Sequence, residues 1–153
     1  MGVSDNRTIG RRHRQGFGTG LLLVALCAWL PPARADDAPA LGIELNKLED
    51  SAEGCRSVFV FDNRTGHELN RFRIDLILFD PKGVYSKQLL LDMAPLRADK
   101  KTVTSFLLDG QPCAEVGSVL VNDVPWCENG AGNALDCVKM LKVDSLAEVP
   151  LQK

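Results

Sequence analysis

Hydrophobic and polar residues alternate with a period of two along much of the chain beyond residue 40. In residues 41–48, Leu41, Ile43 and Leu45 alternate with small or polar residues, which is typical of a β-strand with one buried face. Residues 55–62 are β-branched or aromatic on both faces, as expected of a central strand. Runs of these kinds give seven predicted strands, at residues 41–48, 55–62, 72–79, 84–93, 102–108, 116–124 and 138–143. No helical period of comparable length interrupts them.

Turn sequences separate several of these runs. The segment from Asn63 to Gly66 begins with Asn and ends with Gly, and residues 80–83 read Asp-Pro-Lys-Gly, the chemistry favoured in a type I turn. Asn63 also opens a glycosylation sequon, which we attribute to the needs of the turn. Short strands with such punctuation predict an all-β fold, a two-sheet immunoglobulin-like β-sandwich of about seven strands, with a closed small barrel as the alternative.

The first 35 residues have the parts of an export signal. A leader with four arginines precedes an apolar stretch at residues 17–30, and Ala33-Arg34-Ala35 forms a small-residue cleavage motif. The apolar stretch is shorter than the roughly 20 residues needed to span a bilayer. We therefore predict a cleaved signal helix at residues 1–35 and a single β-sandwich domain at residues 36–153. The mature chain is expected in the periplasm or secreted from a Gram-negative bacterium, with no stable membrane anchor.

The leader leaves two export routes open. Arg11-Arg12 within a long polar leader favours the twin-arginine (Tat) route, whereas His13 and Arg14 replace the apolar residue usually found after the pair. The general secretory (Sec) route is the alternative. Cys27 follows Leu26, where a lipoprotein signal needs a small residue, so we expect Cys27 to be removed with the signal.

The mature domain is acidic. Loss of residues 1–35 removes five of the 18 Lys and Arg and one of the 20 Asp and Glu, which leaves 13 and 19 and a net charge of −6. Nucleic acids and anionic lipids both favour positive surfaces, so neither is expected as the main partner.

Four cysteines remain in the mature domain: Cys55, Cys113, Cys127 and Cys137. An even number in a small exported domain predicts disulfides, with three possible pairings. In an immunoglobulin-like order the strand after Cys55 pairs antiparallel with the strand before Cys113, which predicts Cys55–Cys113 and Cys127–Cys137 bonds. No Cys-x-x-Cys pair is present, so neither a zinc site nor a thioredoxin-like site is expected. We predict no metal and no cofactor.

Several segments also carry a family resemblance: IELNKL (43–48), LILFDPKGV (76–84), APLRADKKTV (94–103), FLLDGQPC (106–113) and VGSVLVNDV (116–124). Together they resemble a family of small secreted proteins of Gram-negative bacteria that carry a Tat pathway signal and have no established activity. The resemblance implies an exported, disulfide-bonded single domain and assigns no catalytic residue. More loosely, the succession of strands and turns looks like extracytoplasmic immunoglobulin-like modules of the FxLYD type, a likeness that says little about function.

Candidate catalytic groups are sparse in the mature sequence. His67 is its only histidine, and no serine lies in a G-x-S-x-G elbow. We interpret Asp75 as the solvent side of a strand, and Asn122-Asp123 as a polar pair that fixes a strand end. The chain is therefore predicted not to be an enzyme, with a hydrolase-type site built on His67 as the residual alternative.

Trp126 and Tyr85 are the candidates for an interaction surface, because exposed aromatic residues anchor interfaces. For Trp126 the alternative is core packing beside a disulfide, as in immunoglobulin domains. The predicted function is a non-enzymatic binding or interaction module of the cell envelope with an envelope protein as partner. The alternative is a small-ligand carrier or periplasmic inhibitor, with a pocket between the sheets or near Trp126.

Overall fold

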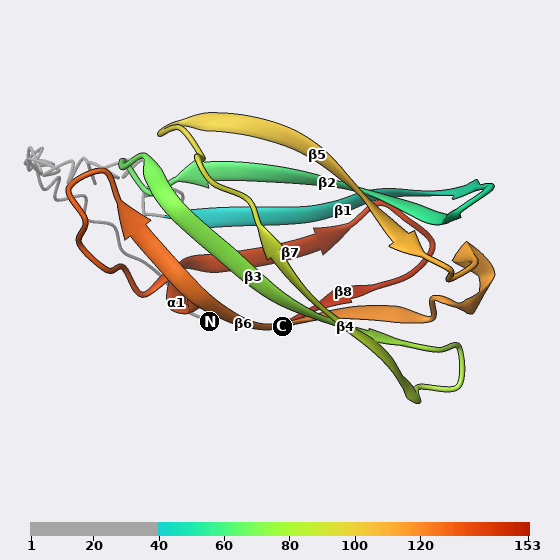
Figure 1. Ribbon diagram of the computed structural model, residues 1–153. Coiled ribbons are helices and arrows are strands. Elements are labelled where there is room, and N and C mark those ends of the chain that lie inside the picture. The colour runs from blue at the N-terminus through green and yellow to red at the C-terminus, as the bar shows by residue number, and fades with distance from the viewer. Residues whose placement is uncertain (1–39) are drawn as a thin grey trace, which may run out of the picture. The chain divides into compact units, whose positions relative to one another are not determined.

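The structure, a computed structural model, describes residues 40–153 (Figure 1). The predicted export signal at residues 1–35 and Cys27 lie outside the described residues. Within residues 40–153, no helix has the length and apolar character required to cross a membrane.

The regular secondary structure of residues 40–153 is almost entirely β-strand, as predicted. The strands are β1 (Ala40–Ser51), β2 (Gly54–Arg64), β3 (Leu69–Phe79), β4 (Tyr85–Asp92), β5 (Lys100–Asp109), β6 (Ser118–Asn129), β7 (Leu141–Ser145) and β8 (Leu151–Gln152). Two single helical turns accompany them, η1 (Cys113–Glu115) and α1 (Cys137–Met140). The strands form two four-stranded sheets, ordered β5-β2-β1-β7 and β4-β3-β6-β8 (Figure 1). The all-β, two-sheet sandwich is therefore confirmed.

The predicted antiparallel pairing of residues 55–62 with residues 102–108 is confirmed as that of β2 with β5. β2 pairs antiparallel with both β1 and β5, and β3 pairs antiparallel with both β4 and β6. The end of the chain contributes one short strand to each sheet, β7 parallel to β1 and β8 parallel to β6.

The last predicted strand, residues 138–143, is wrong in its first half. Residues Cys137–Met140 form the helical turn α1, and β7 starts only at Leu141. Asp136 caps this turn by accepting a hydrogen bond from the backbone N–H of Lys139 at 3.3 Å. The strand β8 was not predicted, because two residues are too short to show a period.

The core lies between the two sheets and is built from the inward-facing residues, which alternate with outward-facing ones along the strands of both sheets. Its largest fully buried side chains include Phe59 and Phe61 of β2 and Phe72 of β3. Phe61 and Phe72 meet edge to face with ring centroids 6.2 Å apart, which joins one sheet to the other.

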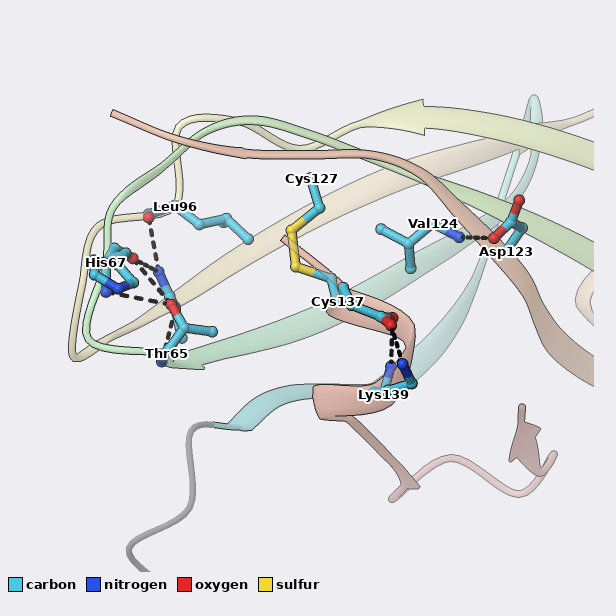
Figure 2. The surroundings of a disulfide bond; sticks show 10 residues. Thr65, His67, Leu96, Asp123, Val124, Cys127, Cys137 and Lys139 are labelled. Atoms are coloured by element: carbon cyan, nitrogen blue, oxygen red, sulfur yellow. Dashed lines mark hydrogen bonds and ion pairs between the residues drawn. A yellow bond between two sulfur atoms is a disulfide. The ribbon is translucent and has the colours of Figure 1, made fainter. Parts of the chain in front are cut away.

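Both predicted disulfides are present. Cys55, at the start of β2, is bonded to Cys113 in η1 with a Cα–Cα distance of 4.7 Å. Cys127 of β6 is bonded to Cys137 of α1 with a Cα–Cα distance of 6.2 Å (Figure 2). The first bond closes a separation of 58 residues and the second a separation of 10.

Backbone and side-chain hydrogen bonds fix the turns. Gly83 donates its N–H to the carbonyl of Asp80 at 2.9 Å and has a φ of 78°, which confirms the predicted turn at residues 80–83. Asn63, at the other end of β2 from Cys55, is fully buried. Its Nδ2 donates to the backbone carbonyls of His67 and Leu96, each at 2.9 Å, and to that of Arg97 at 3.2 Å. Its Oδ1 accepts from Thr65, so this side chain ties the β2–β3 turn to the β4–β5 connection (Figure 2).

Candidate functional site

The outer surface of β4, β3 and β6 carries the most distinctive set of side chains in the described domain. Ile74, Leu76 and Leu78 point into the core, so the residues between them point outward. We call this surface the β4–β3–β6 face. It comprises Arg71, Arg73, Asp75 and Ile77 of β3, Gln88, Leu90 and Asp92 of β4, and Leu120, Asn122, Asp123, Trp126 and Glu128 of β6.

Trp126 stands on this face and not in the core. It is 39% exposed, whereas the next residue, Cys127, points inward and is buried. The reading of Trp126 as core packing beside a disulfide is therefore wrong. Its position follows from strand alternation, since the buried half of the Cys127–Cys137 bond forces the preceding side chain outward.

Two arginines hold the indole ring. The guanidinium carbons of Arg73 and Arg71 lie 3.7 Å and 4.4 Å from the ring centroid, within cation–π distance. Arg73 donates two hydrogen bonds to Asp92, at 2.7 Å and 2.6 Å, and Arg71 donates to Glu128 at 3.0 Å. Each cation is thus fixed by a carboxylate, and the two cations together orient the indole ring.

The Arg73–Asp92 pair shifts the protonation equilibrium of both groups. The hydrogen bond from Arg73 lowers the pKa of Asp92, and the same bond raises the pKa of Arg73. Both side chains are therefore charged at neutral pH, and the pair contributes no net charge to the face.

Asp75 lies at the centre of the face and is buried, with 6% of its surface exposed. Its carboxylate accepts hydrogen bonds from Gln88 Nε2 at 2.8 Å and 2.9 Å and from Asn122 Nδ2 at 2.7 Å. The sequence places Asp75 on the outer side of its strand correctly, but its burial was not expected. It arises because side chains from both neighbouring strands fold over it.

The polar pair at residues 122 and 123 has a different role from the predicted one. Both side chains are exposed, and Asn122 serves as a hydrogen-bond donor to Asp75. Asp123 accepts a hydrogen bond from the N–H of Val124 at 2.7 Å (Figure 2). The strand continues to Asn129, so the pair does not end it.

The structure does not bring the two predicted aromatic residues together. Tyr85 is 58% exposed but pairs with Phe79, whereas Trp126 pairs with Arg73, six positions away along β3. At about 3.3 Å per residue this is a separation of roughly 20 Å. The residues of the β4–β3–β6 face that the sequence did not single out include Arg71, Arg73, Gln88 and Leu90, of which Leu90 is 59% exposed. Their proximity depends on strand register, which periodicity alone does not give.

The hollows of the domain lie away from this face. A space between the sheets, lined by core residues such as Phe59 and Leu76, has a volume of about 10 Å³, room for one water at most. A larger hollow of about 480 Å³ lies where β1 bulges beside η1 and the β7–β8 connection, with Lys47, Asp50 and Glu148 in its lining. Tyr85 lines a third hollow of about 340 Å³ together with Asp80 and Glu115.

His67 lies on the surface at the β2–β3 turn, where its backbone carbonyl accepts the hydrogen bonds from Asn63 and Thr65. Ser57 is buried and donates to the carbonyl of Phe106 at 3.2 Å. Over the described part of the chain, no three or more His, Cys, Asp or Glu residues are grouped so as to hold a metal ion.

Comparison of the chain with protein-family models, with curated proteins and with solved structures returned no match.

Proposed function

We propose that the protein is an exported, non-enzymatic, immunoglobulin-like module that binds a protein of the cell envelope through the β4–β3–β6 face. The observation that supports this proposal is Trp126, an exposed indole fixed between two arginines that are themselves held by carboxylates. Trp and Arg are the residue types most enriched among interface anchors.

The fixed geometry favours binding because the anchor loses little freedom when a partner covers it. Ordering a side chain at an interface costs about 0.5–1.5 kcal/mol. The two Arg–carboxylate pairs already order the side chains around Trp126 in the free protein, so binding has less entropy to remove there. Leu90 adds exposed apolar area two strands away from Trp126. It belongs to β4, an edge strand whose unpaired side offers free backbone groups to an extended segment of a partner.

The experiment compares the mature protein with two variants of exposed apolar residues. Trp126→Ala alters the β4–β3–β6 face, and Val103→Ser alters a residue of β5 that is 66% exposed on the other sheet. Each protein is immobilised and exposed to the envelope fraction of the source cells. We expect a defined partner to be retained by the wild type and by Val103→Ser, and to be lost with Trp126→Ala.

Thermal unfolding of all three proteins provides the folding control. If the folded Trp126→Ala variant retains every partner of the wild type, the proposal is wrong. A reproducible turnover of substrate by a monomer without partners also contradicts it.

Export is the second part of the proposal. Two disulfides are compatible with an oxidising compartment, and the leader predicts cleavage after Ala35. An intact-mass measurement of the protein recovered outside the cytoplasm tests both points. We expect the loss of residues 1–35 and of four hydrogens, whereas an uncleaved or fully reduced chain overturns this part.

A small-ligand carrier or inhibitor is the second candidate, and the hollow of about 480 Å³ beside the β1 bulge favours it. Its volume falls in the range of small-molecule sites, and its lining is mixed in polarity. Leu146 is 67% exposed at its edge. A ligand that raises the melting temperature of the wild type but not of Leu146→Glu supports this candidate, because binding to the native state stabilises it.

A further inference from the structure

The charges on the β4–β3–β6 face do not balance. Arg71 is paired with Glu128 and Arg73 with Asp92. Asp75 and Asp123 remain, and none of the ion pairs within residues 40–153 involves either of them. The two carboxylates occupy directly opposed positions on neighbouring strands, β3 and β6. Like charges in opposed positions of a sheet are destabilising, so this arrangement is costly for the isolated domain.

Asp75 carries the larger cost because it is buried. A buried carboxylate is normally compensated by a cation as well as by hydrogen bonds, and its described donors are neutral amides only. These amides belong to Gln88 and Asn122, whose residues are exposed and able to move aside. Their side-chain oxygens also supply acceptors around the carboxylate.

Apolar surface lies on either side of this anionic centre. Leu90 occupies the position opposite Asp75 on β4, and Trp126 lies one outward-facing row away, opposite Arg73. A partner that covers Leu90 and Trp126 would exclude water from Asp75, which strengthens any charge pair formed there.

We infer that the envelope partner inserts a basic side chain, arginine or lysine, beside Asp75 and Asp123, with apolar residues of the partner covering Leu90 and Trp126. The inference rests on the proposed function and specifies its partner chemistry. The carboxylates and side-chain amide oxygens provide acceptors for a guanidinium or ammonium group, and the flanking residues provide its apolar contacts.

The test uses matched synthetic peptides as probes. Each is an acetylated and amidated extended peptide of about nine residues, long enough to cross the three strands, with leucines flanking one central position. The central residue is Arg, Lys, Gln or Glu. Binding to the mature domain is followed by chemical-shift changes of its backbone amides, which report both affinity and location.

We expect the Arg and Lys peptides to bind at least about tenfold more tightly than the Gln peptide, as close buried charge pairs require. The Glu peptide should bind least. The shifts should map to Asp75, Leu90 and Trp126. Raising the ionic strength about tenfold should lower the affinity of the Arg peptide more than that of the Gln peptide, because salt screens only the charge pair.

Asp75→Asn is the decisive variant, since it removes the charge with little change of shape. We expect it to reduce the discrimination between Arg and Gln peptides severalfold, because only Asp123 is left to pair with the cation, and we expect Asp109→Asn, at an exposed aspartate at the end of β5, to preserve it. Equal binding of Arg and Gln peptides by the wild type overturns the inference even if Asp75→Asn fails to fold. Discrimination that is undiminished in folded Asp75→Asn overturns it too.

Calcium alone is the remaining probe, because carboxylate and amide oxygens are also ligands for that ion. If calcium shifts the Asp75 resonances and the peptides bind equally well, the inference is wrong and the site holds a metal ion in place of a basic side chain. These outcomes are separate from the test of the proposed function. Partner loss in Trp126→Ala with partner retention in Asp75→Asn would support the binding face and reject the basic side chain.

Discussion

Asn63 in β2 and Asp75 in β3 are both buried polar side chains on inner strands, one in each sheet, but their hydrogen-bond partners differ in kind. Asn63 donates to three backbone carbonyls and accepts from Thr65, which is itself buried. Asp75 is held by two side chains from exposed residues. The partners of Asn63 are mostly backbone carbonyls, whereas those of Asp75 are side chains of exposed residues.

This difference leads to different expectations for substitutions at the two positions. A side chain bonded to backbone carbonyls of two connections holds those connections together, and replacing it leaves orphaned acceptors inside the protein. A carboxylate bonded to amides of exposed residues on an outer face can exchange those bonds for bonds to another molecule at small cost. We therefore expect substitutions around Asn63 to change stability, and substitutions around Asp75 to change binding.

The largest effect is expected from the disulfide at the other end of β2. The double variant Cys55→Ala/Cys113→Ala opens a loop of 58 residues, for which the chain-entropy model gives a loss of about 4 kcal/mol in the free energy of unfolding. Cys127→Ala/Cys137→Ala opens a loop of 10 residues and is the matched control, with about 3 kcal/mol expected. Urea denaturation measures both. A larger loss from the shorter loop would contradict the expectation that the Cys55–Cys113 bond, at the start of β2, contributes more to the stability of the sandwich.

Asn63→Ala comes next. It removes several buried hydrogen bonds at once and should lower the free energy of unfolding by about 3 kcal/mol. Asn70→Ala, at an exposed position of β3, is the control and should change the free energy by less than about 0.5 kcal/mol. Peptide and partner binding by folded Asn63→Ala should equal that of the wild type. A small loss of stability would remove the distinction drawn between the two buried residues.

The sequence was most informative where its local chemistry decides the structure. The alternation in residues 41–48 and the Asp80-Pro81-Lys82-Gly83 turn both appear as predicted, because each depends on neighbours in the chain. The disulfide pairing also followed, since an immunoglobulin-like order brings Cys55 close to Cys113. Residues 138–143 were misread because an N-cap at Asp136 and the Cys127–Cys137 bond favour a helical turn there.

The candidate site was only partly accessible to such reasoning. The outward direction of Asp75 follows from the period of its strand, but its burial depends on Gln88 and Asn122 from two other strands. Trp126 was identified as a candidate, and the arginines that hold it were not. Which residues oppose one another is set by register, and three register shifts between β3 and β6 displace those positions from any simple count.

Removing the two amides beside Asp75 is the direct counterpart of the Asn63 experiment. Gln88→Ala/Asn122→Ala deletes all described donors to Asp75 but also uncovers the carboxylate, so water replaces the lost bonds. The expected loss of stability is about 1 kcal/mol, smaller than for Asn63→Ala. Urea denaturation of this double variant and of Asn63→Ala compares their free energies of unfolding. A loss equal to that of Asn63→Ala would make Asp75 a structural anchor like Asn63.

The smallest effect is expected at the exposed Arg73–Asp92 pair, in the row beside Asp75. Because the hydrogen bond from Arg73 lowers the pKa of Asp92, the pair stabilises the folded state above the ordinary carboxyl pKa, and this contribution disappears as the pH falls through the lowered value. The melting temperature of Asp92→Asn should lie slightly below that of the wild type at neutral pH, and the gap should close as the pH falls below the ordinary carboxyl pKa of about 4 and through the lowered pKa of Asp92. In an Arg73→Gln background, Asp92→Asn should leave no gap at either pH. A gap that persists at low pH, or one as large as that of Asn63→Ala, would mean that the ionic contacts of the β4–β3–β6 face are structural and would count against its use as a binding surface.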